Sequence, residues 1–348
     1  MKKLLYWFGK NRENHPWRSS KEAYGIWISE IMLQQTTIAA VRDYYTAWMK
    51  RFPTINSLAQ ASEQEVLRQW EGLGYYSRAR NIHKSAQVLD AAGTELPKDY
   101  KELLKLPGIG PYTAAAISSI AFGLPHPVID GNIKRILCRI FLWPKWNKER
   151  ETQASACLDK WIKPGPAGDF NEAMMELGQK ICTKSSPQCG QCPFNSLCLA
   201  HKENRQNEIP EATSSRQIIK KTCLIICVHH NHILMTEKKQ GLLKGLWVFP
   251  ALQGHELSPV LEWLKKHDAD FKGPLVLKIQ NHLYTKYKDQ LLPLVFRLES
   301  TISLNEEKGC WIPLDKIGDF PMASVYRKIV GELEKCLEKK NTRFICLP

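Results

Sequence analysis

Apolar residues recur at helical spacing through roughly the first 200 residues, where Pro and Gly punctuate the pattern and period-two alternation is nearly absent. Two helix starts are marked by an N-cap side chain followed three residues later by a glutamate, at Ser62 with Glu65 and at Asp99 with Glu102. The pattern therefore predicts an all-α domain over residues 1–200.

The pattern changes in the last third of the chain. Residues 201–216 are polar and lack a sustained hydrophobic period, which predicts a linker. Beyond them, four segments have the composition of strands, and a tight His-His-Asn turn joins the first two: 222–228, 232–236, 274–279 and 291–298. Two helices accompany the strands, and the last one is predicted at 324–340 with one apolar face formed by Val325, Ile329, Leu333 and Leu337. The predicted fold class is multi-domain, with the all-α domain followed by a smaller α+β domain over 217–348.

Length and charge narrow the class of partner. A chain of 348 residues can form two domains that each bury their own core. A formal charge of +14 and a pI near 9.2 favour a polyanion, with nucleic acid the leading partner and a solvated basic surface the alternative. No apolar run is long enough to span a bilayer, and the basic start of the chain reads as an amphipathic helix and not as a signal peptide. We expect a soluble, intracellular, cytoplasmic protein without a membrane partner.

Four of the eleven cysteines are crowded into a short segment, Cys182-x6-Cys189-x2-Cys192-x5-Cys198. Four closely spaced thiolates in a loop with Pro and Gly suit a 4Fe-4S cluster, which takes its protein ligands from Cys. Structural zinc is the rival metal, although four-cysteine zinc sites usually come as two Cys-x2-4-Cys knuckles. Unliganded core cysteines are a poor alternative, because the neighbouring residues are polar.

A glycine-rich turn lies between two helical segments at Leu106-Pro107-Gly108-Ile109-Gly110, and Pro111 opens the second helix. Gly108 and Gly110 allow a sharp turn and a close approach to a ligand, while free N–H groups at the helix start favour a phosphate. The functional interpretation is a helix–hairpin–helix that binds the DNA backbone. The alternative is an ordinary tight turn between helices.

Two carboxylates occupy positions suited to acid catalysis. Glu30 stands alone in the strongly apolar helical segment 26–36, where apolar surroundings would raise the pKa of its carboxyl and let it donate a proton at neutral pH. An exposed position with no special role is the equally weighted alternative. Asp130 precedes a helix, where an N-cap is its ordinary role. Sugar chemistry through an oxocarbenium-like transition state also needs a carboxylate that stays ionised, so Glu30 and Asp130 could divide the work as acid and anion.

Together these motifs resemble the helix–hairpin–helix DNA glycosylases with an iron–sulfur loop, and within them the MutY adenine glycosylases. The resemblance covers residues 1–200. It is carried by the four cysteines and by the motifs Pro16–Arg18, Trp27–Thr36, Glu71–Arg78, Leu106–Thr113, Asp130–Asn132 and Phe170–Glu172.

The resemblance implies a role for each matching residue. Glu30 would protonate adenine at N7, and Asp130 would stabilise the cationic sugar and help direct the incoming water. Tyr112 and Asn132 would support that pair. The residues expected to hold the extruded adenine are Trp17, Arg18 and Glu172.

Further matching residues would contact the duplex. The resemblance places Gln35 and Tyr75 as side chains that wedge into the DNA, and Leu73 and Thr36 against 8-oxoguanine. An ordinary core position is the alternative for Tyr75 and Leu73. Bifunctional relatives carry a catalytic lysine two residues after the last Gly of the hairpin, where this chain has Tyr112. The resemblance therefore implies a monofunctional enzyme that does not cut the strand.

The second domain resembles, more weakly, the Nudix-like module with which this family inspects 8-oxoguanine, chiefly at Gly245–Pro250. Residues 251–275 lack the run of glutamates with which a Nudix hydrolase holds magnesium, so a recognition module is expected. In the lesion-sensing loop the family commonly has Phe-Ser-His. This chain has Tyr284, Thr285 and Lys286, which keep the aromatic ring and the hydroxyl but change the charge.

The expected function is removal of adenine mispaired with 8-oxoguanine or guanine in double-stranded DNA, during base excision repair, by a monomer associated with the nucleoid. A mismatch thymine or endonuclease III-like glycosylase is the alternative enzyme. A non-catalytic iron–sulfur protein that only binds DNA is the alternative from a different class.

Overall fold

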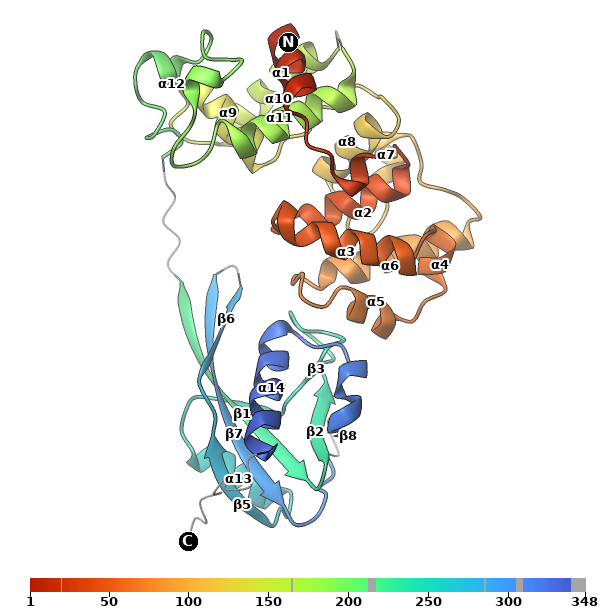
Figure 1. The fold of residues 1–348 in the computed structure, drawn as a ribbon, viewed down its shortest axis with the longest axis vertical. Coiled ribbons are helices and arrows are strands. Elements are labelled where there is room, and N and C mark those ends of the chain that lie inside the picture. Colours follow the sequence, from red (N-terminus) through yellow and green to blue (C-terminus); the bar gives the residue numbers. More distant parts are fainter. Residues whose placement is uncertain (20, 164, 212–216, 285, 305–308, 339–348) are drawn as a thin grey trace. The chain divides into compact units, whose positions relative to one another are not determined.

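The computed structural model describes most of the chain, namely residues 1–19, 21–163, 165–211, 217–284, 286–304 and 309–338 (Figure 1). The chain forms two compact units. The first contains Met1–Gln60 and Asn81–Thr213, and the second contains Ala61–Arg80 and Ser214–Pro348. The second unit thus includes a segment, Ala61–Arg80, that the hydrophobic pattern groups with the helical domain.

The first unit is helical throughout its described part. Its elements are α1 (Lys2–Asn11), η1 (Pro16–Arg18), α2 (Ala23–Leu33), α3 (Ile38–Arg51), α4 (Ile55–Ala59), α6 (Ser77–Ala91, which starts in the second unit), α7 (Tyr100–Leu103), α8 (Pro111–Ile120), α9 (Gly131–Ile140), α10 (Lys148–Ile162), α11 (Ala167–Lys180), η2 (Cys189–Gln191) and α12 (Leu199–Lys202). Among the described residues, no helix combines the length and apolarity needed to cross a membrane.

Three buried helices form the centre of the first unit. Helix α2 is buried at nine consecutive positions, from Tyr24 to Met32, because it packs against α8 as well as α3. Helix α8 is rich in Ala and Ser on its buried positions, which lets neighbouring helices approach closely. Helix α11 contacts α8, α9 and α1, and its Phe170 and Leu177 lie in the core with Leu137 of α9. Polar side chains on these helices are therefore held in one fixed arrangement.

The second unit is built on a mixed sheet with the strand order β3-β2-β1-β7-β5, in which β1 and β7 are parallel and all other pairs are antiparallel. Its elements are α5 (Glu63–Gln69), β1 (Ile218–His229), β2 (His232–Glu237), β3 (Trp247–Val248), β4 (Ala251–Gln253), α13 (Ser258–Lys266), β5 (Phe271–Val276), β6 (Gln280–Tyr284), β7 (Tyr287–Leu298), β8 (Gly309–Pro313), η3 (Leu314–Asp319) and α14 (Ser324–Glu338).

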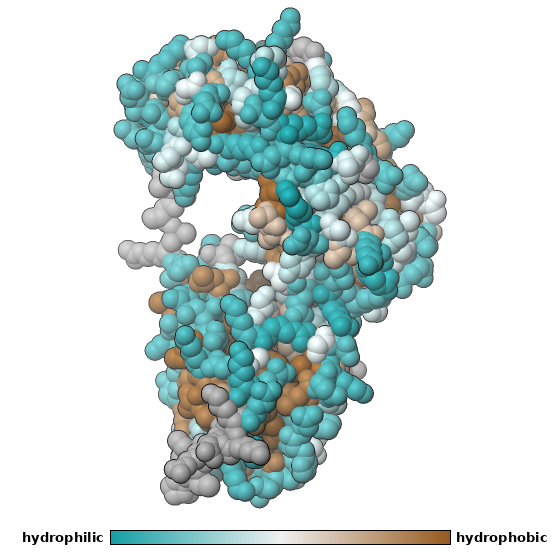
Figure 2. All heavy atoms as spheres, viewed as in Figure 1, coloured by the Kyte–Doolittle hydropathy of each residue, from teal (hydrophilic) through white to brown (hydrophobic). Residues whose placement is uncertain are grey.

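Both faces of this sheet are covered. Alternate residues of β1, such as Ile225 and Cys227, pack with Val260 and Leu264 of α13. The intervening residues of β1 are equally buried on the other face, across which α14 lies in Figure 1. Apolar atoms nevertheless show on the visible surface of this unit in Figure 2, and its exposed side chains include Ile219, Val276 and Leu283.

The predicted fold class is confirmed, an all-α part followed by a smaller α+β part with a mixed sheet and flanking helices. The predicted strands are all present, although β5 begins at Phe271 and not at Pro274, and β7 extends back to Tyr287. Helix α14 is described to Glu338, and its predicted last two residues lie outside the described part of the chain. In the predicted linker, residues 212–216 also lie outside it.

Candidate active site

A cavity of about 370 Å³ opens among η1, α2, α8, α9 and α11 of the first unit. This volume lies in the usual range of small-molecule sites, roughly 300–1,000 Å³. Its lining contains many of the site residues expected from the sequence, which are Trp17, Arg18, Glu30, Thr36, Tyr112, Asp130, Asn132 and Glu172. Segments more than 150 residues apart in the sequence thus line one pocket. Arg18 and Glu176, for example, are hydrogen-bonded although 158 positions separate them in the chain.

Glu30 is the buried acid of this pocket. It lies near the C-terminal end of α2 and is only 5% exposed. The Tyr112 hydroxyl donates a hydrogen bond to its Oε2 at 2.7 Å. Burial raises the pKa of Glu30 to about 7, helped by the nearby carboxylates of Glu172 and Asp130, while the Tyr112 hydrogen bond lowers it. At neutral pH a large fraction of Glu30 is therefore protonated and able to donate.

Asp130 is the second carboxylate and also the N-cap of α9. Its Oδ1 accepts from the Ile133 backbone N–H at 2.7 Å, and its Oδ2 accepts from the Asn132 amide at 2.8 Å. Burial raises the pKa of Asp130, but these two hydrogen bonds oppose the rise because they favour the ionised form. The helix N-terminus adds a fixed positive potential beside the carboxylate. The N-cap hydrogen bond therefore also orients the Asp130 carboxylate in the pocket.

An ion-pair network holds Arg18 in the wall of the pocket. Arg18 Nε lies 2.8 Å from Glu172 Oε1, and its Nη1 lies 2.7 Å from Glu176 Oε2. Lys180 binds the other oxygen of Glu176 at 2.7 Å. Because Glu172, Glu176 and Lys180 follow one another at a spacing of four, they share one face of α11. Arg12 adds a second cation to Glu172 at 3.2 Å.

Two residues of this wall, Glu176 and His15, were not predicted from the sequence. Glu176 is 2% exposed and lines the cavity. Its signal was its place one helical turn after Glu172, on the same face of α11. His15 is buried, and its ring stacks on Trp17 with centroids 4.9 Å apart. No local pattern marks His15, because only the fold brings it beneath Trp17.

The predicted hairpin forms a tight turn directly before α8. Gly108 has φ 78°, and a Cβ there would come within 2.6 Å of the Asn81 side chain, so the position requires Gly. Gly110 caps the ten-residue helix α8, and a Cβ built there would meet nothing within 4 Å. The first N–H groups of a helix such as α8 have no partner within the helix, and they are the groups that bind a phosphate in other proteins.

The two residues expected to wedge into the duplex share an unusual backbone. Gln35, just after α2, has φ 59°, and Tyr75 has φ 46°. Both side chains are exposed, Tyr75 to 44%. Left-handed backbone at non-glycine residues is uncommon and tends to mark functional turns. Leu73, expected against the lesion, is 6% exposed.

The expected lesion-sensing residues lie at the β6–β7 hairpin of the second unit. The Tyr284 hydroxyl donates to Asp289 Oδ2 at 3.0 Å, and Asp289 Oδ1 accepts from Thr222 at 2.8 Å. Burial, together with the carboxylate of Asp289, raises the pKa of Tyr284, which is therefore neutral. The ring of His282 packs edge-on against Tyr284. Thr285 lies outside the described residues.

The four cysteines of the predicted cluster loop line one small cavity, together with Arg139, His201 and Gln206. His201 Nδ1 and Gln206 Oε1 are buried there without a hydrogen-bond partner. Among the described residues, no three His, Cys, Asp or Glu side chains converge on the position of a single metal ion. Four thiols around one enclosed space are the donor set that a 4Fe-4S cluster takes, and the cluster would stabilise this loop.

A chain of hydrogen bonds connects this loop with Asp130. Arg135 on α9 donates from Nη2 to Asn132 Oδ1 at 2.9 Å and from Nε to the Cys182 carbonyl at 2.8 Å. One turn further along, Arg139 donates to Cys182 Sγ at 3.3 Å and to the Thr183 carbonyl at 2.7 Å. Helix α9 therefore orients the Asp130 carboxylate at one end and supports the cysteine loop along its length.

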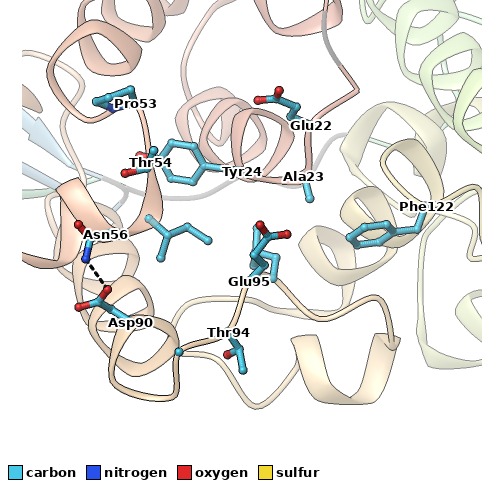
Figure 3. A pocket seen from close by; sticks show the side chains of 13 residues that line it. Glu22, Ala23, Tyr24, Pro53, Thr54, Asn56, Asp90, Thr94, Glu95 and Phe122 are labelled. Carbon is cyan, nitrogen blue, oxygen red and sulfur yellow. Dashed lines mark hydrogen bonds between the residues drawn. The ribbon is translucent and has the colours of Figure 1, made fainter.

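A larger cavity of the first unit, about 640 Å³, contains none of the expected site residues. Figure 3 shows its lining, in which the Asn56 amide donates to Asp90 at 2.8 Å. The carboxylates of Glu22 and Glu95 also line it. It lacks the paired acid and anion of the smaller pocket, so size alone does not identify the site.

Comparisons with known proteins agree with this geometry. The family model described as HhH-GPD superfamily base excision DNA repair protein matches residues 28–164, and the iron–sulfur binding domain of endonuclease III matches residues 182–198. The adenine DNA glycosylase of Buchnera aphidicola subsp. Baizongia pistaciae is 34% identical over 339 residues, covering 95% of this chain and 96% of that protein. The human adenine DNA glycosylase is 42% identical over 218 residues, covering 59% of this chain and 40% of that protein.

Among solved structures, a thermostable thymine-DNA glycosylase matches with a TM-score of 0.54 at 26% identity, covering 58% of this chain and 94% of that one. Fold, hairpin, cysteine loop and pocket together define a helix–hairpin–helix DNA glycosylase with a 4Fe-4S cluster. Within that class, the chain belongs to the adenine DNA glycosylase family.

Proposed function

We propose that this protein hydrolyses the N-glycosidic bond of adenine paired with 8-oxoguanine or guanine in duplex DNA, and leaves an abasic site without cutting the strand. One observation carries the proposal above all others. The pocket pairs a buried carboxyl, Glu30, whose pKa is about 7, with a second carboxyl, Asp130, whose ionised form is favoured by two hydrogen bonds.

The chemistry follows from these two groups. Glu30 transfers its proton to N7 of the extruded adenine, so that the C1′–N9 bond breaks with its electron pair leaving on a neutral base. The sugar is left cationic, and the Asp130 carboxylate stabilises it electrostatically until water adds at C1′ and gives up a proton, which the ionised Glu30 takes up. Tyr112 keeps Glu30 oriented through its hydrogen bond. Because Tyr112 occupies the hairpin position of the lyase lysine, no Schiff base forms there.

The pocket wall supports recognition of a purine. Trp17 offers a flat ring, and Arg18, fixed by Glu172 and Glu176, offers guanidinium donors to ring nitrogens. Gln35 and Tyr75 carry exposed side chains on left-handed turns, suited to fill the space that the flipped base leaves. Tyr284 and its hairpin would inspect the opposite base. All residues of the reaction come from one chain, so we expect a monomer acting on the chromosomal DNA of the nucleoid.

Single-turnover base release from short duplexes tests the proposal. Duplexes would contain A opposite 8-oxoguanine, A opposite G, or T opposite G, with Glu30→Gln and the exposed-residue control Glu102→Gln assayed beside the parent. We expect adenine release that Glu30→Gln abolishes and Glu102→Gln preserves, with strand scission only after alkali. Release of thymine would instead favour the mismatch thymine alternative, and binding without release would favour the non-catalytic one.

A further inference from the structure

Glu71 and Arg327 form an ion pair inside the second compact unit. Arg327 on α14 donates to both carboxylate oxygens of Glu71, through Nε to Oε1 and through Nη2 to Oε2. The Met322 backbone N–H donates to the same Oε2 at 3.1 Å. Such a two-pronged guanidinium–carboxylate contact fixes direction as well as distance. The side chains are 25% and 19% exposed, so solvent screens the pair only in part.

Arg327 is itself held in place by the second domain. Its Nη1 donates to the Ile317 carbonyl at 2.7 Å, and its Nη2 also donates to the Phe320 carbonyl. The guanidinium therefore joins the end of η3, the start of α14 and Glu71 at one point. Lysine could not make this set of contacts, because an ammonium lacks the planar fork of donors.

Other contacts of the segment Ala61–Arg80 surround this pair. The buried Tyr76 hydroxyl donates to the Met322 carbonyl at 3.0 Å. The Gln64 amide donates to the Gly245 carbonyl at 3.0 Å. Gly245 has φ 79°, and a Cβ there would come within 2.8 Å of Leu67, so the segment and the β2–β3 connection pack too closely for any larger residue.

The turn that follows Glu71 has a conformation that needs such support. Gly72 and Gly74 have φ 103° and 68°, and Tyr75 adopts a left-handed φ of 46°. A non-glycine residue is strained in this region, so neighbouring contacts must hold it. The Trp70 indole donates to the Gly74 carbonyl at 3.0 Å from within the segment. The two ends of the turn are held by contacts with the second domain, at Glu71 through Arg327 and at Tyr76 through the Met322 carbonyl.

We infer that the Glu71–Arg327 pair is a positioning element that locks the Gly72–Tyr75 turn to the second domain, so that turn and domain read the base opposite adenine as one rigid body. Arg327 thereby determines discrimination between 8-oxoguanine and guanine without touching either base. This discrimination rests on the proposed function, whereas the locking of the turn does not. Neither Glu71 nor Arg327 lines the pocket of the first unit in which we propose that the chemical step takes place.

The test compares Arg327→Met, Glu71→Gln and the double variant with the parent, in the full-length, cluster-loaded protein. Arg327→Lys keeps the charge but loses the fork. The matched control is Lys272→Met, which removes an exposed ion pair with Glu299 in the same unit. If the two residues act only through each other, the double variant is no worse than either single one.

The first readout is amide hydrogen exchange of the free protein. We expect Arg327→Met to accelerate exchange at residues 72–76 about tenfold or more, with residues 224–228 of β1 unchanged and Lys272→Met without effect. Unchanged exchange at the turn, or equal acceleration in turn and β1, overturns the inference, since the second result means general destabilisation. This readout needs no activity, so it decides the locking of the turn even if the parent releases no adenine and the proposed function fails.

The second readout is the ratio of single-turnover adenine release opposite 8-oxoguanine to that opposite guanine. We expect Arg327→Met to lower this ratio about tenfold, mainly by slowing the 8-oxoguanine reaction, and Arg327→Lys to restore little of it. An unchanged ratio overturns the role in discrimination, and so does an equal loss on both substrates.

Discussion

The hydroxyl of Tyr112 lies 2.7 Å from Oε2 of Glu30, and this hydrogen bond joins the first turn of α8 to the buried helix α2. The same helix start is the second half of the hairpin that we propose binds a DNA phosphate. The proposed binding of the DNA backbone and the orientation of Glu30 therefore both depend on one short stretch of chain, from Leu106 to Tyr112.

The acid role of Glu30 predicts a pH dependence. Its pKa of about 7 lies above the ordinary value because burial disfavours the charged form. Since the protonated form is the donor, we expect single-turnover adenine release to fall as pH rises through about 7. Rates measured from acidic to alkaline pH, with DNA binding checked at each pH, give the profile. A rate that increases across neutrality would contradict the assignment.

Tyr112→Phe should move that profile. The Tyr112 hydrogen bond lowers the pKa of Glu30, because it stabilises the carboxylate. Its loss raises the pKa further, so the descending limb of the rate profile shifts to higher pH. Tyr6→Phe, at a position 66% exposed, is the matched control and should leave the profile in place. A shift toward lower pH would show that Tyr112 acts in another way.

Glu176→Ala should destabilise the first unit strongly. The substitution removes the buried acceptor shared by Arg18 and Lys180, so that Arg18 keeps only Glu172 and Lys180 keeps only Glu13 as a carboxylate partner. Loss of one partner from a buried network costs about 3–5 kcal/mol, and we expect a fall in the free energy of unfolding of that order. Urea unfolding followed by circular dichroism measures it. Glu102→Ala, which breaks an exposed pair with Lys105, should change it by less than about 1 kcal/mol.

Arg139→Met should weaken retention of the iron–sulfur cluster. Arg139 is 3% exposed and donates to Cys182 Sγ and to backbone carbonyls of the cysteine loop. Without these donors the loop loses its support on α9, so we expect less iron and sulfide per chain and lower visible absorbance. Arg205→Met, at a surface arginine bound to Glu208, should retain the parent's content. Equal cluster content in both variants would refute this role of Arg139.

The sequence determined the local features of this protein. The spacing of Cys182, Cys189, Cys192 and Cys198 predicted the cluster loop, because its ligands come from seventeen consecutive residues, 182–198, which the iron–sulfur family model also matches. The hairpin at Gly108 and the long strands β1 and β7 were likewise predictable, since turn chemistry and hydrophobic alternation act over a few residues. The short strands β3, β4, β6 and β8 were not predicted, because pairing across the sheet defines them and their own composition does not.

Only the tertiary structure decided whether each polar residue is buried in the pocket or exposed to solvent. Glu30 could have been exposed or buried on sequence grounds, and the packing of α2 against α8 buries it and raises its pKa. Glu176 and His15 gained a place in the pocket wall only through folding. The sequence pattern places the segment Ala61–Arg80 in the helical domain. In the structure the segment belongs to the second unit, where its Glu71 and Tyr76 bind Arg327 and Met322. Burial and long-range pairing depend on residues far apart in the chain, so no local pattern encodes them.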